Sequence, residues 1–189
     1  SGTICADLLD YLKRDNYYCG LSHSFDERLF YYFRIADDQL VLDLHQHGIF
    51  RRDALSEVTN LLRIRYILSE RVYYHHAKIA SGAMVSKAVE AALRLGFDPR
   101  LLCDLTDDTL LYHLDHTWGA DPAVGALVRA LRERRLYKRC YAASRELDAS
   151  VKEQLVTDYH YNENGRRELA EAAIAAQLGL APHEVAIYC

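Results

Sequence analysis

The chain lacks the paired cysteines that mark a zinc site or a redox motif, since no C-x-x-C pair occurs in its 189 residues. Its cysteines are odd in number and scattered, so a disulfide framework is not predicted either. The sequence instead predicts reduced, mostly buried thiols in a cytoplasmic protein. The cysteines are Cys5, Cys19, Cys103, Cys140 and Cys189.

Two further absences limit the partners of the protein. No apolar run approaches the length of a membrane-spanning helix, and no stretch resembles a signal peptide. The formal net charge is −4, so the chain lacks the basic excess that nucleic acids or anionic membranes attract. The sequence therefore argues against both membrane and nucleic-acid partners.

Proline is scarce, with 3 residues in the whole chain and none between Arg52 and Leu95. Because proline interrupts helices, this stretch can be helical, and its apolar residues recur at helical spacing. We predict two long helices here, or one long helix with a bend at residues 73–75. Cap residues and glycines predict further helices at about 7–18, from 106, at 121–135 and at about 163–178.

Strands are predicted in few places, so the predicted fold class is mainly α. The strands form a small β-hairpin at residues 30–44 and short C-terminal segments at 136–141 and 184–189. The predicted core consists of the apolar helix faces at 61–68, 83–93, 110–114 and 126–131.

Residues 7–15 form the most distinctive stretch of the chain. On a helix, Asp7, Tyr11 and Asp15 lie at i, i+4 and i+8 and form one row. Carboxylates accept hydrogen bonds or bind a hard cation, and a tyrosine offers a flat apolar ring with a polar tip. The row fits the wall of a polar pocket. The alternative is a solvated amphipathic helix whose acids pair with Lys13 and Arg14.

A second group combines cations and aromatic rings between residues 63 and 78. It contains Arg65, Arg71, Tyr73 and His75, and the last of these is four residues from Arg71. Guanidinium groups bind phosphate through paired hydrogen bonds, and aromatic rings pack against a base or sugar. The alternative is a long helix whose arginines pair with its own glutamates at the surface.

The stretch 4–20 resembles a signature of HD-superfamily phosphohydrolases. The pattern D-x-D-R/K-x-D-Y-x-x-R-D-x-x-x-x-G is that of the dNTP triphosphohydrolase-like branch. The resemblance implies that Asp7 is the last metal ligand of an H…HD…D set and that Tyr11 and Asp15 contact the sugar. Two residues depart from the pattern: Cys5 stands where an acid is usual, and Leu8 stands where a phosphate-contacting cation is usual.

The run from residue 65 to 76 is similar to the segment that follows the HD core in the same branch. The resemblance implies that Arg65 contacts phosphate. Tyr73 and His75 occupy the last positions of the motif. Residues 105–108 and 132–141 also resemble the branch, so the likeness extends in order over about residues 1–142. The resemblance implies that the fold is an HD-domain-like helical lobe. We expect 1–142 to be the C-terminal portion of an HD-type phosphohydrolase domain and 143–189 a small, truncated α/β segment.

The histidines of an HD site are missing, because no His-Asp dipeptide occurs in the chain. The sequence therefore holds one implied metal ligand, Asp7, and part of a substrate pocket. The chain opens without methionine and closes within a predicted strand, so we expect a fragment of a longer protein. We expect this chain alone to be inactive, to hold no metal, and to expose an apolar face at Leu8, Leu9 and Leu12.

The predicted function is a part of a metal-dependent HD phosphohydrolase that hydrolyses a nucleotide, dNTP-like, or a related phosphate ester. The resemblance implies a divalent metal (Mg, Mn, Fe, Ni or Zn) in the parent protein, which we expect to be a cytoplasmic homo-oligomer. One alternative is a non-catalytic HD-like module for oligomerisation or nucleotide sensing. Another is a helical nucleic-acid binder using Arg63, Arg65 and Arg71, against which the net charge speaks.

Overall fold

The computed structural model describes residues 4–144 and 146–188, with only the backbone of Glu163. These residues are mainly helical, as predicted, and carry two small antiparallel hairpins. The chain divides into two compact units between His75 and His76. The predicted boundary at residue 142 concerns the extent of the HD-type domain and stays a prediction. No helix in the described ranges is both long and apolar enough to cross a membrane.

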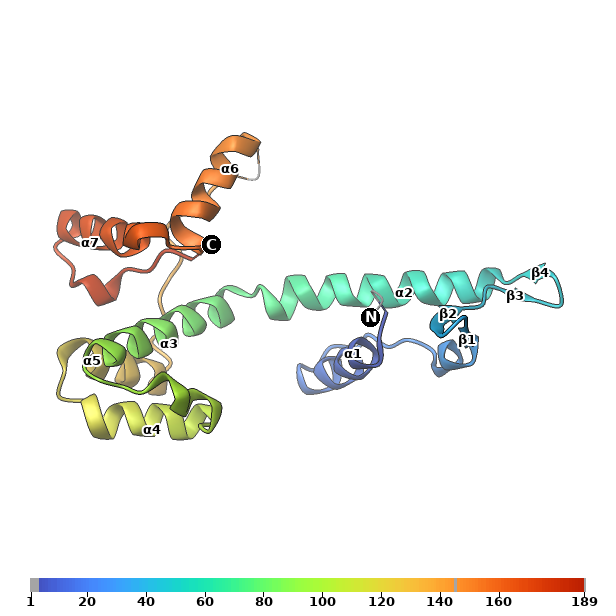
Figure 1. Cartoon of the computed structure of the whole chain (residues 1–189), viewed down its shortest axis with the longest axis horizontal. Helices are drawn as coiled ribbons and strands as arrows, with labels where there is room; N and C mark the ends of the chain where they lie inside the picture. The colour runs from blue at the N-terminus through green and yellow to red at the C-terminus, as the bar shows by residue number, and fades with distance from the viewer. Residues whose placement is uncertain (1–3, 145, 189) are drawn as a thin grey trace. The chain divides into compact units, whose positions relative to one another are not determined.

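In the N-terminal unit a short helix and a 3-10 turn pack against one longer helix, and two small hairpins precede that helix in the chain (Figure 1). The chain turns back at Gly20, whose φ of 67° suits glycine, so the first helix ends where predicted. The elements are α1 (Ala6–Tyr18), η1 (Glu27–Tyr32), β1 (Phe33–Ala36), β2 (Gln39–Leu42), β3 (His45–Gln46), β4 (Ile49–Phe50), α2 (Arg52–Leu68) and η2 (Ser69–Tyr73).

Both hairpins close through two-residue turns with left-handed backbone. Asp37 and Asp38 join β1 to β2 with φ of 49° and 57°, and His47 and Gly48 join β3 to β4 with φ of 51° and 76°. Such turns match the twist of antiparallel strands, and aspartate and glycine tolerate them. The predicted hairpin is therefore present, but its first strand begins at Phe33, because the 3-10 turn η1 occupies residues 27–32.

The core of the N-terminal unit lies between α1 and α2. Leu8, Leu9 and Leu12 of α1 are buried there with Leu61 and Leu68 of α2. The prediction of an exposed leucine face on α1 is therefore wrong. The physical reason is that α2 covers this face within the same chain, so no second copy is needed to bury it.

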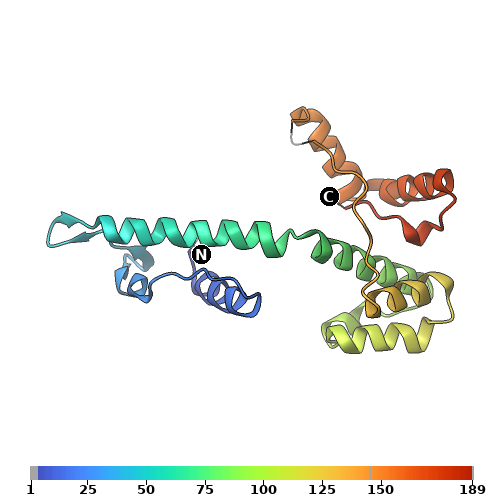
Figure 2. The same cartoon turned by 180° about the vertical axis from the view of Figure 1, so that it is seen from behind.

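The C-terminal unit is built on α3, against which α5 and α4 pack (Figure 2). Its elements are α3 (His76–Arg94), η3 (Pro99–Cys103), α4 (Asp107–Trp118), α5 (Pro122–Arg132), α6 (Ala149–Leu155), η4 (Val156–His160), η5 (Glu163–Gly165), α7 (Arg166–Leu178) and η6 (Pro182–Glu184). The core residues Met84, Leu114, Leu127 and Val128 come from the predicted helix faces. The predicted helical faces are thus buried, although they form two cores rather than one.

The helix starts of this unit follow from local hydrogen bonds. Thr106 and Thr109 form a capping box at α4, and Asp121 accepts hydrogen bonds from the backbone N–H groups of Ala123 and Val124, each at 3.0 Å. These contacts satisfy donors that the first helical turn leaves unpaired. At the other end of the unit, Gly179 closes α7 with a φ of 67°.

The predicted strands at 136–141 and 184–189 are wrong within the described residues, where both segments lack strand structure up to residue 188. Cys189 lies outside the described residues. The first segment is instead joined to η6, because the Tyr137 hydroxyl donates to the carbonyl of His183. An extended segment without a partner strand cannot form a sheet. The prediction also missed α6.

The prediction of mostly buried thiols is wrong as well. Cys19, Cys103 and Cys140 are exposed, and Cys5 is half-buried. These four thiols are free in the described part of the chain.

Candidate functional site

Two side chains from distant parts of the sequence meet in the N-terminal unit. Asp15 lies near the end of α1, and Tyr73 is the last residue of η2, 58 positions later. The Tyr73 hydroxyl donates a hydrogen bond to Oδ2 of Asp15 at 2.6 Å. This short bond to a charged acceptor fixes the carboxylate relative to α2 and η2.

A third side chain completes this group. The ring of Tyr11 stands edge-to-face against the ring of Tyr73, with centroids 6.0 Å apart and planes at 74°. Tyr11 and Asp15 are one helical turn apart on α1, so the same face presents both to Tyr73. We call Tyr11, Asp15 and Tyr73 the tyrosine–aspartate cluster.

The π-helical turn η2 ends at the residue that joins the cluster. In this turn the backbone N–H of Tyr74 bonds to the carbonyl of Ser69 at 2.9 Å, five residues back. The wider turn changes the direction of the side chains that follow α2. Tyr73, the last residue of this turn, is the residue that donates the hydrogen bond to Asp15 of α1.

Burial raises the pKa of Tyr73 well above its usual range, and the hydrogen bond to Asp15 raises it further. The phenol is therefore neutral and acts as the donor at physiological pH. Asp15 keeps its second oxygen, Oδ1, without a hydrogen bond from the described residues. This oxygen can accept a bond from a hydroxyl group of a ligand.

The raised pKa predicts how stability depends on pH. An unfolded tyrosine ionises near about pH 10, whereas folded Tyr73 holds its proton to higher pH. Its contribution to stability is thus complete below about pH 10 and is lost as the pH rises further. Tyr73→Phe is expected to reduce the alkaline loss of stability in urea unfolding, measured between about pH 8 and about pH 11. The exposed Tyr17→Phe is the control, and equal curves for both variants would contradict the prediction.

The other predicted site residues are outside the cluster. Asp7 is exposed in the first turn of α1, two helical turns before Asp15. Arg65 is exposed in the last turn of α2, where its guanidinium group pairs with no acid of the described residues. His75 is exposed at the end of the N-terminal unit.

The described residues do not form a metal centre. Across 4–144 and 146–188, no group of three or more histidine, cysteine, aspartate or glutamate side chains could hold an ion. Asp7 supplies a single exposed carboxylate, whereas a divalent cation needs several fixed ligands. The residues present therefore do not fit the implied metal by themselves.

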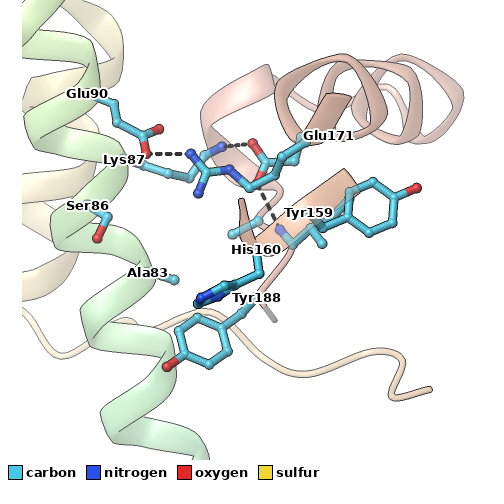
Figure 3. A pocket seen from close by; sticks show the side chains of 11 residues that line it. Ala83, Ser86, Lys87, Glu90, Tyr159, His160, Glu171 and Tyr188 are labelled. Carbon is cyan, nitrogen blue, oxygen red and sulfur yellow. Dashed lines mark hydrogen bonds and ion pairs between the residues drawn. The ribbon is translucent and has the colours of Figure 1, made fainter. Parts of the chain in front are cut away.

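Sequence reasoning missed a charged network in the C-terminal unit (Figure 3). Nζ of Lys87 on α3 lies 2.6 Å from Oε2 of Glu171 on α7, and their side chains are only 13% and 5% exposed. Glu171 also accepts the backbone N–H of Ile187 at 2.8 Å, and Arg167 pairs with Glu90 at 2.6 Å. The charges line a cavity of about 260 Å³.

This network serves the fold. Each of its cations already has a carboxylate partner, so little charge is left to bind a ligand. Its bonds attach α7 and the segment around Ile187 to α3. No sequence pattern could indicate it, because Lys87 and Glu171 are 84 positions apart.

Comparison with known proteins identifies the family. A family model described as the HD-associated region matches residues 26–188. The chain is 31% identical over 97 residues to the uncharacterized protein YwfO of Bacillus subtilis (strain 168). The aligned stretch covers 50% of this chain and 21% of YwfO. It is similar in fold to the crystal structure of a phosphohydrolase from Bacteroides thetaiotaomicron, with a TM-score of 0.59 and 19% identity over 97% of this chain and 48% of that one.

The chain thus spans about a fifth of the curated relative and about half of the similar solved structure. Arg65, Tyr73 and His75 lie within the matched region, whereas Asp7, Tyr11 and Asp15 precede it. The predicted relation to HD proteins is confirmed at the level of the family, and the match extends over most of the described residues. The chain belongs to the HD-associated region family.

Proposed function

We propose that this chain is part of a metal-dependent HD phosphohydrolase, of the dNTP triphosphohydrolase-like branch, that hydrolyses a nucleotide or a related phosphate ester. The observation that carries the proposal is the 2.6 Å hydrogen bond between Tyr73 and Asp15. It joins residues 4–20 to residues 65–76, the two stretches that separately resemble HD phosphohydrolases. The phosphohydrolase fold of the Bacteroides protein supports the proposal.

The cluster has the chemistry to position a sugar. The edge-to-face pair of Tyr11 and Tyr73 supplies a half-buried aromatic surface against which a sugar ring can pack. Asp15 would accept a hydrogen bond from a sugar hydroxyl through Oδ1, while Tyr73 holds Oδ2 and so fixes the carboxylate. In this proposal Tyr73 is a positioning residue for Asp15.

Three further roles belong to the same proposal. Arg65 would contact phosphate, for which its unpaired guanidinium group is suited, and His75 would lie near the substrate. Asp7 would be one ligand of a divalent metal whose other ligands are not among the described residues. The proposal also places the parent protein in the cytoplasm as a homo-oligomer.

Hydrolysis of a nucleotide panel tests the proposal. The protein as its gene encodes it, supplied with manganese or magnesium, is expected to release phosphate from at least one nucleotide. Asp7→Ala is expected to lower this release at least about 10-fold, because losing even a group that only orients a metal ligand typically weakens metal affinity by about 10–100-fold. The exposed Asp10→Ala in the same helix is the matched control. Equal activity of Asp7→Ala and the unmodified protein would refute the role of Asp7.

One observation favours the alternative of a non-catalytic nucleotide-sensing or oligomerisation module. Leu8 stands where the resemblance expects a phosphate-contacting cation, and its side chain is buried in the core of the N-terminal unit. This position therefore cannot contact phosphate. Nucleotide binding without hydrolysis of any member of the panel would support the module and contradict the enzyme.

A further inference from the structure

The C-terminal unit contains a second cavity, of about 330 Å³, which the proposed function does not use. Its floor is α3, where Ile79, Ala80 and Ala83 line it. Its wall is the irregular segment 137–143, and Ala186 and Tyr188 line it near the end of the described chain. Its volume falls in the range of small-molecule pockets, roughly 300–1,000 Å³. We call it the α3 pocket.

Aromatic rings surround the floor of small side chains. The rings of Tyr141 and Tyr188 are exposed, so they are accessible for stacking. Tyr137 differs from them, because its hydroxyl donates to the carbonyl of His183 and holds the wall segment in place. Alanine at positions 80 and 83 lets a flat ring approach the helix closely.

The charge of the α3 pocket has one sign. Lys138 and Arg139 line it and have no ion-pair partner within the described residues. None of the described residues that line the pocket is acidic. The neighbouring cavity around Lys87 is different, because carboxylates there satisfy each cation. Two unsatisfied cations beside aromatic rings attract an anion that carries a planar ring.

We propose that the α3 pocket binds a mononucleotide. The base stacks on Tyr141 and Tyr188 above the alanines of α3, and the phosphate is held by Lys138 and Arg139. Stacking on aromatic side chains suits any base, and a guanidinium group can bind phosphate through two hydrogen bonds. This site lies wholly in the C-terminal unit and does not depend on the tyrosine–aspartate cluster.

Cys140 provides a local probe of the pocket. Its thiol is free, exposed and part of the lining, whereas Cys19 and Cys103 are exposed elsewhere. Alkylation by iodoacetamide, followed residue by residue with mass spectrometry, measures access to each thiol. Adenosine 5′-monophosphate at ten times its dissociation constant is expected to slow alkylation of Cys140 about 10-fold and to leave Cys19 and Cys103 unchanged. Adenosine and inorganic phosphate at the same concentrations are expected to protect less.

Two changes to the pocket separate the contributions of charge and space. Lys138→Gln/Arg139→Gln is expected to weaken protection at least about 10-fold, since charge-assisted bonds are lost. Ala80→Phe, which keeps both cations but fills the floor, is expected to remove protection. Arg94→Gln/Arg129→Gln loses the same charge outside the pocket and is the matched control. Each variant is compared with its own ligand-free rate, and its helical content is checked by circular dichroism.

The proposal is overturned if several millimolar adenosine 5′-monophosphate does not slow alkylation of Cys140. It is also overturned if both pocket variants keep full protection, or if the control variant loses it equally. Asp15→Asn should leave protection unchanged, because Asp15 belongs to the N-terminal unit. A failure of the α3 pocket is thereby distinguished from a failure of the proposed hydrolase site.

Discussion

Glu171→Ala is expected to lower the free energy of unfolding of the C-terminal unit by about 3–5 kcal/mol. The substitution leaves Lys87, which is only 13% exposed, without its carboxylate partner at 2.6 Å. It also removes the acceptor of the Ile187 backbone N–H. An unpaired buried charge is costly because it has lost water without gaining a partner. Urea unfolding followed by fluorescence of Trp118, the single tryptophan, reports on this unit.

A double substitution separates the cost of an unpaired charge from lost packing. Lys87→Met/Glu171→Leu removes both charges and keeps apolar volume, so it is expected to destabilise much less than Glu171→Ala alone. Arg135→Gln is the surface control, because its partner Glu133 is exposed and such pairs contribute about 0–1 kcal/mol. A loss below about 1 kcal/mol for Glu171→Ala would show that the network of α3 and α7 does not hold this unit together.

Leu12→Ala is expected to cost the N-terminal unit about 2–5 kcal/mol. The Leu12 side chain is fully buried, with 0% exposure, in the core that α1 and α2 share. Truncation leaves a cavity that the neighbouring side chains fill only in part. The effect can be measured as loss of hydrogen-exchange protection in the peptides of α1.

A leucine of α2 serves as the matched control for this prediction. Leu62 has the same chemistry but is 42% exposed, so Leu62→Ala is expected to cost well under half as much. The comparison also tests the correction made to the sequence-based prediction. If α1 exposed its leucines, Leu12→Ala would have an effect no larger than Leu62→Ala.

Local patterns predicted the helices well, because the signals that begin and end them lie within a few residues. Thr106 and Asp121 cap the helices that follow them, and Gly20 and Gly179 take the left-handed backbone at helix ends. The expected break near residues 73–75 is also present, where α2 and its π-helical turn end and α3 begins. These features required no knowledge of tertiary contacts.

The errors arose where tertiary contacts decide the structure. The two tyrosines in residues 136–141 favour a strand, yet no partner strand is present within the described residues. The leucines of α1 fitted a docking face equally well, because the sequence does not indicate that α2 covers them. The Lys87–Glu171 pair was missed for the same reason, because its two residues are distant in sequence and meet only in the folded chain.

The candidate site was predicted in part. Tyr11, Asp15 and Tyr73 were singled out by spacing and resemblance, and the structure brings these three together. Neither spacing nor resemblance indicated that Tyr73 donates a hydrogen bond to Asp15, or that Oδ2 is the oxygen that accepts it. Asp7 and Arg65 make no such contact with the cluster in the described chain, and the roles of Asp7, Arg65 and His75 depend on the proposal.

The most direct test of the central claim is the hydrolysis kinetics of Asp15→Ala in the protein as its gene encodes it, with a deoxynucleotide as substrate. If the cluster positions the sugar, Asp15→Ala is expected to lower kcat/KM at least about 10-fold, as for a lost hydrogen bond to a charged group. Tyr73→Phe should lower it less, because the carboxylate remains and loses only its positioning donor. Asp10→Ala, on the same helix but outside the cluster, should leave kcat/KM unchanged. Equal kcat/KM values for Asp15→Ala and Asp10→Ala would contradict the assignment of the cluster to substrate binding.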